Sequence, residues 1–574
     1  MANGDWRANL QEDDVAARIG YVLILAAAVS LTNCGRMGMD RAVQQFLTEH
    51  VQKIGELERQ MNLAYWEAAT TGTQESYDRY RELQLRYRTV YADKDDFQRV
   101  KRWYESGKLR GDLLRQITLL YNRYLANQID STLLRQIVDK STEIEQKFNT
   151  HRAWFEGKRV SNNEILEVLR NEVRSARRKE AWEASKQVGQ VVAPQLLELV
   201  RLRNQAARSL GFPNYYVMSM KLSEQDPEQV LRIFDELAEL TDGAFSELKA
   251  ELDGALARMY GLSPEELRPW HYHDPFFQEV PRVFEVDLDS FYASRDVKEL
   301  ARGFFASIGL EVDDILARSD LYERNGKDQH AFCTDIDRAG DVRVLANLRN
   351  DEYWMNTILH ELGHAVYDKY IDRTLPFLLR EPAHTFTTEA VAMLFGRLSR
   401  NPAWLGAMLS LDEATVRRLA PEVERSLRAQ QLIFSRWCQV MVRFERALYE
   451  DPDQDLNTLW WDLVERYQFV RRPDQRRQPD WAAKIHFTSA PVYYHNYMLG
   501  ELLASQLHFA ILRRAVGRSG DAEFGYVGEP RVGDFLRQQV FSAGSRYRWD
   551  EMIRRATGEE LTPRYFVQQF VKHS

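Results

Sequence analysis

The 574-residue chain contains little cysteine and no strong excess of either charge. Its three cysteines, Cys34, Cys333 and Cys438, cannot build a disulfide framework, and their spacing does not match a zinc site. We expect Cys333 and Cys438 to be free, buried thiols. The formal net charge is −8, with acidic and basic residues interleaved, so the sequence lacks the basic surface that nucleic-acid binding requires. We therefore expect no nucleic-acid partner.

The apolar run Ile19–Leu31 has thirteen residues, which is too short to cross a membrane comfortably but fits the central part of a secretory signal. Leu31-Thr32-Asn33-Cys34 is similar to the box at which bacterial lipoproteins are cleaved and lipidated, with Asn33 in place of the usual small residue. The alternatives are a buried N-terminal helix or a start codon placed too far upstream. We expect residues 1–34 to be a leader, and the protein to be exported, periplasmic or membrane-anchored through lipidated Cys34, and otherwise cytoplasmic.

Repeats, low-complexity tracts and Pro/Gly/Ser linkers are missing from the sequence, and apolar residues recur at three-to-four spacing along most of it. This pattern predicts a mainly α fold: a large, two-lobed helical body around a deep cleft. We expect residues 35–574 to form one domain, with an N-terminal helical lid at about 35–200 and a catalytic body at about 200–574. Helices are predicted at 161–188 and 191–210, among others. Residues 329–348 alternate and are rich in β-branched side chains, which predicts a two-stranded hairpin.

The strongest chemical motif is His360-Glu361-Leu362-Gly363-His364, followed by Glu389 twenty-five positions after the second histidine. On a helix, the two histidines lie one turn apart on one face, and Glu361 between them reaches a water molecule without being a ligand. Three protein ligands with one open position are typical of catalytic rather than structural zinc. A chance match is the alternative. The apolar residues 353–359 and the small Ala390 and Ala392 favour a buried zinc helix packed closely on a second helix.

A zinc peptidase also needs donors for the oxyanion and, for a chain-end substrate, a cation for the carboxylate. Lys484 and His486 lie two positions apart, and Tyr494 and Tyr497 follow at a spacing of one helical turn. Taken alone, these residues are more typical of a solvated lysine and core aromatic side chains. Beside the zinc motif they are candidates for both functions.

Together these motifs resemble those of the gluzincin peptidases, which include angiotensin-converting enzyme, thimet oligopeptidase and oligopeptidase F. The similarity rests on the zinc motif with Glu389, on His330-Ala331-Phe332-Cys333, and on Lys484-Ile485-His486 followed by Tyr494-His495-Asn496-Tyr497. It is densest over residues 200–505, and the N-terminal third matches only in being helical.

The resemblance implies one Zn²⁺ per chain, bound by His360, His364 and Glu389. It also implies that Glu361 activates the attacking water and passes its proton to the leaving amine. His486 and Tyr497 would stabilise the oxyanion.

For the substrate, the resemblance implies that His330 and the backbone of Ala331 hold the peptide around the scissile bond. Lys484, Tyr494 and, from a looser match, Gln278 would bind the terminal carboxylate.

The sequence departs from the converting enzymes in three ways. Twenty-four residues lie between His364 and Glu389, which resembles the oligopeptidase branch, whereas the converting enzymes have one fewer. His495-Asn496 lies where they have a chloride-binding arginine, and Met393 lies where an acidic residue supports a zinc ligand. Chloride dependence is therefore not implied, and the groups around the ligands must differ.

We expect a zinc peptidase that releases dipeptides from the C-terminus of short peptides. The alternatives are a zinc oligoendopeptidase that cuts short peptides internally and a non-catalytic peptide-binding homologue.

Overall fold

The computed structural model describes the backbone of residues 9–284, 286–518, 520 and 523–571, and the side chains of these residues except 9–37 and 284. Helices dominate, and the described strands form two antiparallel sheets of two strands each. The predicted mainly α fold with a small hairpin is confirmed. Of the two thiols predicted to be free and buried, both are free; Cys438 is buried, whereas Cys333 is half-buried.

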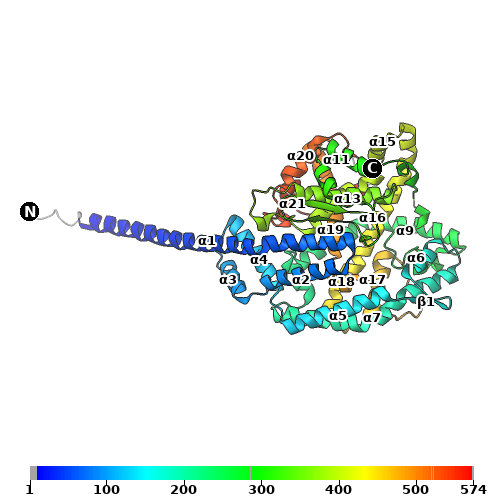
Figure 1. The fold of residues 1–574 in the computed structure, drawn as a ribbon, viewed down its shortest axis with the longest axis horizontal. Coiled ribbons are helices and arrows are strands. Elements are labelled where there is room, and N and C mark those ends of the chain that lie inside the picture. The colour runs from blue at the N-terminus through cyan, green and yellow to red at the C-terminus, as the bar shows by residue number, and fades with distance from the viewer. Residues whose placement is uncertain (1–8, 285, 519, 521–522, 572–574) are drawn as a thin grey trace, which may run out of the picture.

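The N-terminal helices pack around a small core of their own, which is separate from the main core. They are α1 (Asn9–Thr71), α2 (Gln74–Tyr91), α3 (Lys94–Glu105) and α4 (Gly111–Ala126). The next helix, α5 (Ser131–Thr150), packs on the main core instead, to which it contributes Ile144. The first part of α1 extends away from the body (Figure 1).

The predicted leader falls largely on residues whose side chains the structure does not describe. Residues 1–8 lie outside the described backbone, and the side chain of Cys34 is not described. The backbone of α1 continues without a break past position 34. Within the described part of the chain, no helix is both long and apolar enough to cross a membrane.

The predicted helix break near residue 190 is wrong. The chain breaks at 172–174 instead, between α6 (Asn162–Asn171) and α7 (Ser175–Ser209). There the Glu172 carboxylate accepts the backbone N–H groups of Val173 and Arg174, at 2.9 Å each. Gly189 marks a close approach within α7: a Cβ there would lie 2.6 Å from the carbonyl oxygen of Pro479. A second, unpredicted hairpin, β1 (Ala153–Phe155) with β2 (Lys158–Val160), precedes α6.

The middle of the chain leads from α7 to the hairpin predicted at 329–348. Its helices are α8 (Tyr215–Leu222), α9 (Pro227–Tyr260), η1 (Pro264–Glu266), η2 (Pro269–His271), η3 (Arg282–Phe284), α10 (Asp289–Tyr292), α11 (Val297–Ser307) and α12 (Asp313–Arg318). The hairpin itself is confirmed: β3 (Phe332–Asp335) pairs antiparallel with β4 (Val342–Leu345), and Phe332 faces Leu345.

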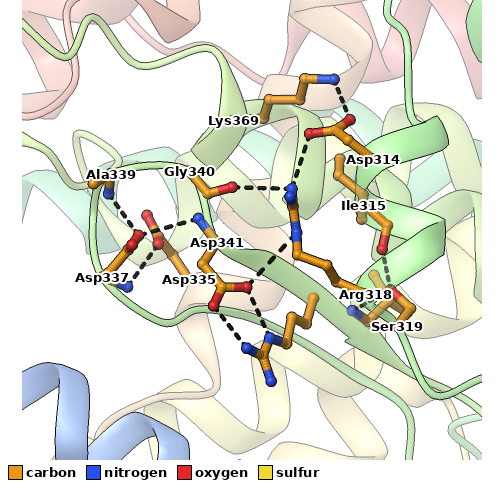
Figure 2. A network of polar contacts seen from close by, with 12 residues as sticks. Asp314, Ile315, Arg318, Ser319, Asp335, Asp337, Ala339, Gly340, Asp341 and Lys369 are labelled. Carbon is orange, nitrogen blue, oxygen red and sulfur yellow. Dashed lines mark hydrogen bonds and ion pairs between the residues drawn. The ribbon is translucent and has the colours of Figure 1, made fainter.

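The turn of this hairpin is tied to the neighbouring helices by polar contacts (Figure 2). The Asp337 carboxylate accepts the N–H groups of Ala339 and Asp341, at 2.8 and 3.1 Å. Arg318 of α12 donates to the carbonyl of Gly340 at 3.0 Å and to Asp314 at 2.9 Å. Lys369, which ends the next helix, also pairs with Asp314, at 2.6 Å. The hairpin is therefore fixed to the helix that carries the zinc motif.

The C-terminal half contains the helices that build most of the main core. They are α13 (Glu352–Lys369), η4 (Phe377–Leu379), α14 (Thr385–Gly396), η5 (Arg397–Arg400), α15 (Pro402–Leu409), α16 (Glu413–Glu450), α17 (Leu456–Gln468), η6 (Asp480–Ala483), α18 (His486–Ser489), α19 (His495–Ile511), η7 (Leu512–Val516), α20 (Pro530–Leu536), η8 (Arg537–Phe541), α21 (Trp549–Thr557) and α22 (Arg564–Phe570). Three of them carry the candidate site: α14 packs against α13 on one side and against α19 on the other.

Candidate metal centre

Glycine allows the three site helices to approach closely. On α13, a Cβ at Gly363 would lie 2.7 Å from Cα of Ala392 on α14. On α19, a Cβ at Gly500 would lie 3.3 Å from Cβ of Glu389. The first distance is shorter than a Cβ atom can adopt without a shift of the backbone, so that contact requires glycine, and the second is tighter than most Cβ contacts. The small residues thus bring the backbone of α14 within reach of α13, and Glu389 with it.

The three predicted ligands meet at one point. Nε2 of His360 and Nε2 of His364 are 3.3 Å apart, and Oε2 of Glu389 lies 3.6 Å from the first and 3.8 Å from the second. Ligands about 2.0–2.1 Å from a tetrahedral zinc ion are separated by roughly 3.3–3.4 Å. The residues present therefore fit zinc. Among the described residues, no other group of three or more His, Cys, Asp or Glu side chains lies close enough together to hold a metal ion.

Thr388 contacts one of the candidate ligands and was not predicted from the sequence. Its hydroxyl oxygen lies 2.8 Å from Nδ1 of His364, which leaves Nε2 of that ring directed at the other ligands. A partner at the second ring nitrogen sets the tautomer and orientation of a metal-binding histidine. A threonine beside a glutamate is too common for its sequence position to reveal this contact.

Burial sets the charge state of the site. It lowers the pKa of His360 to about 4 and also lowers the pKa of His364, so both rings are neutral, as ligands must be. Burial, and then the charge of Glu389, raises the pKa of Glu361 to about 8, although a hydrogen bond from the N–H of Cys333 opposes the shift. Burial also raises the pKa of Glu389 to about 7. A divalent cation here would lower both carboxyl pKa values, because an adjacent positive charge favours the carboxylate.

The predicted oxyanion donors, His486 and Tyr497, both pack against the ring of Tyr494. The His486 ring centroid is 5.1 Å from that of Tyr494, and the Tyr494 centroid is 5.4 Å from that of Tyr497. The Tyr494 hydroxyl accepts a 2.6 Å hydrogen bond from the indole of Trp437 and is buried. Tyr497 remains half-buried, and burial and the charge of Glu389 raise the pKa of its phenol. Tyr497 is thus a protonated donor close to the ligands.

The structure brings Lys484 and Gln278 together, although 206 positions separate them. Nζ of Lys484 donates to Oε1 of Gln278 at 2.7 Å and lies 5.6 Å from the Tyr494 ring centroid. Both residues, together with His486, line a cavity of about 210 Å³. Burial lowers the pKa of Lys484 to about 8. The three residues predicted to bind a terminal carboxylate are therefore neighbours.

The predicted substrate-binding residues His330 and Ala331 directly precede β3. His330 is exposed, and its backbone N–H donates to Asp328 at 3.0 Å. The adjacent strand reaches the site through the hydrogen bond from the N–H of Cys333 to Glu361. The hairpin is thus beside the zinc motif, whereas the structure shows no hydrogen bond or ring contact between the His330 side chain and the ligands in the described part of the chain.

Comparison with known proteins places the whole arrangement in one family. Residues 39–269 and 280–570 match the model of the Peptidase M2 family, described as angiotensin-converting enzyme. The chain is 21% identical to the inactive angiotensin-converting enzyme-related protein of Caenorhabditis elegans over 68% of this chain and 47% of that protein. It is 26% identical to carboxypeptidase 1 of Bacillus subtilis over 47% of this chain and 56% of that one. With thermostable carboxypeptidase 1 of Pyrococcus furiosus the identity is 22%, over 65% of this chain and 86% of the relative.

The matched segments span about half the length of the first two relatives. The family match, in contrast, covers most of this chain and includes the zinc motif, Glu389, Tyr494 and Tyr497. The chain belongs to the angiotensin-converting enzyme family of peptidases.

Proposed function

We propose that the protein is a zinc-dependent peptidase that releases dipeptides from the C-terminus of short peptides. The observation that carries this proposal is the meeting of His360, His364 and Glu389, whose ligand atoms lie within 4.8 Å of one another, beside the carboxylate of Glu361. When bound, zinc supplies a Lewis acid that polarises the substrate carbonyl and makes water a stronger nucleophile.

In this proposal Glu361 moves the proton. It directly follows the candidate ligand His360, and the N–H of Cys333 donates a hydrogen bond to its carboxylate. Glu361 takes the proton of the attacking water and delivers it to the leaving amine. Tyr497 donates a hydrogen bond to the oxyanion, and such a donor contributes on the order of 3 kcal/mol in the transition state.

Cleavage from the C-terminus is supported by Lys484. Its ammonium group, hydrogen-bonded to Gln278, faces a cavity that also reaches His486. A free carboxylate bound there gains a charge-assisted hydrogen bond that an internal peptide segment lacks.

Internal cleavage is the second candidate, and a different observation favours it. A larger cavity of about 510 Å³ is lined by Thr388, which contacts the ligand His364. That space admits several residues upstream of the scissile bond. A non-catalytic, peptide-binding role is the third candidate, because one relative carries the word inactive in its name. The presence of all three candidate ligands and of Glu361 argues against a non-catalytic role for this chain.

Digestion of a decapeptide of defined sequence tests these candidates. We expect successive loss of two residues from the free C-terminus, detected by mass spectrometry, and complete inhibition by a chelator that is reversed by zinc. Amidation of the C-terminus should slow cleavage sharply. Internal cuts that do not depend on amidation would replace the proposal with an oligoendopeptidase, and no cleavage with zinc bound would favour the non-catalytic homologue.

We also propose export of the protein through residues 1–34, supported by the apolar run and the Cys34 box. Expression in a bacterial host with a labelled fatty acid tests this. Label on the wild-type protein and none on Cys34→Ser would agree with lipidation, and an unlabelled, uncleaved wild-type protein would contradict it.

A further inference from the structure

Val492 has a backbone conformation that its side chain disfavours. Its φ is +56°, and it is the only β-branched residue among the described non-glycine residues with positive φ. In this region a β-branched side chain clashes with its own backbone, so the conformation persists only where the surroundings enforce it. Strain of this kind occurs preferentially at functional sites. Val492 directly precedes Tyr493 and Tyr494, at the start of α19.

Glu445 of α16 is the group that holds Val492. Its carboxylate oxygen accepts the backbone N–H of Val492 at 2.7 Å, and both residues are buried. Burial raises the pKa of Glu445 to about 8. The hydrogen bond compensates a backbone donor that would otherwise be buried without a partner.

The turn at Val492 directs the two following tyrosines to different surroundings. Tyr494 is 6% exposed and accepts a hydrogen bond from Trp437. Tyr493 is half-buried, and burial and then the charge of Glu389 raise the pKa of its phenol. Nevertheless both rings contact the same third ring. The Tyr493 and Tyr494 centroids lie 5.2 and 5.4 Å from the centroid of Tyr497, both edge to face. Edge-to-face packing of this kind restrains the orientation of a ring.

We propose that Glu445 is a positioning residue for catalysis: by holding Val492 in the left-handed conformation, it sets Tyr493 and Tyr494 against Tyr497 and so aims the Tyr497 hydroxyl. The effect of Glu445 on catalysis, its catalytic half, rests on the proposed function. The positions that Glu445 gives to Val492 and the tyrosines do not depend on that function. Neither Glu445 nor Val492 belongs to the motifs that carry the family resemblance, and Tyr493 is also absent from the set of residues predicted from the sequence.

The test compares Glu445→Leu, which removes the acceptor, with Glu445→Gln, which keeps an acceptor oxygen in a side chain of similar shape. In the metal-free proteins, hydrogen exchange of the segment 490–497 is followed by mass spectrometry. We expect exchange at least tenfold faster in Glu445→Leu and unchanged in Glu445→Gln. Equal protection in all three proteins would overturn the positioning, whether or not the protein is a peptidase.

The catalytic half is tested with zinc bound. We expect Glu445→Leu to lower kcat about 10- to 100-fold, because Tyr497 acts in the transition state, and to raise KM by a smaller factor, because Tyr494 belongs to the proposed carboxylate site. Adding Val492→Gly to Glu445→Leu should raise kcat at least fivefold above that of Glu445→Leu, since glycine adopts the left-handed conformation without the clash. A wild-type kcat in folded Glu445→Leu would overturn the proposal.

Two variants cover the case in which Glu445→Leu does not fold. Tyr493→Phe keeps the ring and should keep kcat within threefold, whereas Tyr493→Leu should lower it at least tenfold. Equal rates for these two variants would overturn the proposal. A wild-type protein that cleaves no peptide would contradict the proposed function and the catalytic half together, while the exchange experiment still decides the positioning.

Discussion

Nδ1 of His364 lies 2.8 Å from the hydroxyl oxygen of Thr388, the residue that precedes the candidate ligand Glu389. One short segment of α14 thus supplies both a candidate ligand and the group that orients another ligand on α13. This contact predicts that zinc affinity depends on a residue that is not itself a ligand.

Thr388→Val removes the hydroxyl while retaining the shape of the side chain. We expect zinc affinity to fall about 10- to 100-fold, because the His364 ring loses the partner that sets its tautomer and orientation. Competition with a chromogenic chelator measures the change. Thr388→Ser keeps the hydroxyl and should stay near the wild type. Equal affinities in all three proteins would show that the contact does not orient the ring.

Glu361→Gln removes the proposed base and preserves the size of the side chain. We expect kcat to fall about 10³- to 10⁴-fold, with zinc still bound in a one-to-one ratio, because Glu361 is not a ligand. Peptide cleavage and metal analysis of the same sample check both statements. A rate equal to that of the wild type would remove Glu361 from the mechanism.

Lys484→Met removes the cation beside Gln278. We expect kcat/KM for peptides with a free C-terminus to fall about 10- to 100-fold, which is the usual cost of losing a hydrogen bond to a charged group. Cleavage of C-terminally amidated peptides provides the control and should not change. Equal losses on both kinds of peptide would mean that Lys484 acts on the structure rather than on the carboxylate.

The same lysine predicts a pH dependence of substrate binding. Burial lowers the pKa of Lys484 to about 8, so the free protein carries the ammonium below that pH and loses it as the pH rises through this value. We therefore expect KM for free-carboxylate peptides to rise above about pH 8, and KM for amidated peptides to stay flat there. A KM that is flat for both peptides up to pH 9.5 would contradict the assignment.

Gly363→Ala tests the close approach of α13 to α14. The new Cβ would lie 2.7 Å from Cα of Ala392, a backbone atom that cannot move aside. We expect the free energy of unfolding to fall by about 1–3 kcal/mol, the usual cost of overpacking a core. Gly243→Ala, on α9, is the matched control, because its Cβ meets nothing within 4 Å. That variant should gain up to about 1 kcal/mol from helix propensity. Thermal unfolding of both variants measures the difference, and a stable Gly363→Ala would show that the helices can separate without cost.

Local regularities made several elements predictable. The helix around His360 and His364 follows from apolar residues at helical spacing, and the hairpin at β3–β4 follows from alternation around a turn. The small residues near Glu389 correctly indicated a close helix contact. The break predicted near residue 190 was wrong: α7 continues through Gly189, which packs closely against the Pro479 carbonyl.

The sequence by itself determined the chemistry of the site: two histidines one helical turn apart, a carboxylate between them, and a third candidate ligand on a second helix. Spacing within a helix is a local property, so the motif can be recognised in the sequence alone. Only the tertiary structure decided that Thr388 contacts His364, that Lys484 contacts Gln278, and that Tyr493 and Tyr494 both pack against the ring of Tyr497. These contacts join side chains on elements that packing brings together, and the directions in which those side chains point depend on the whole core rather than on any local pattern.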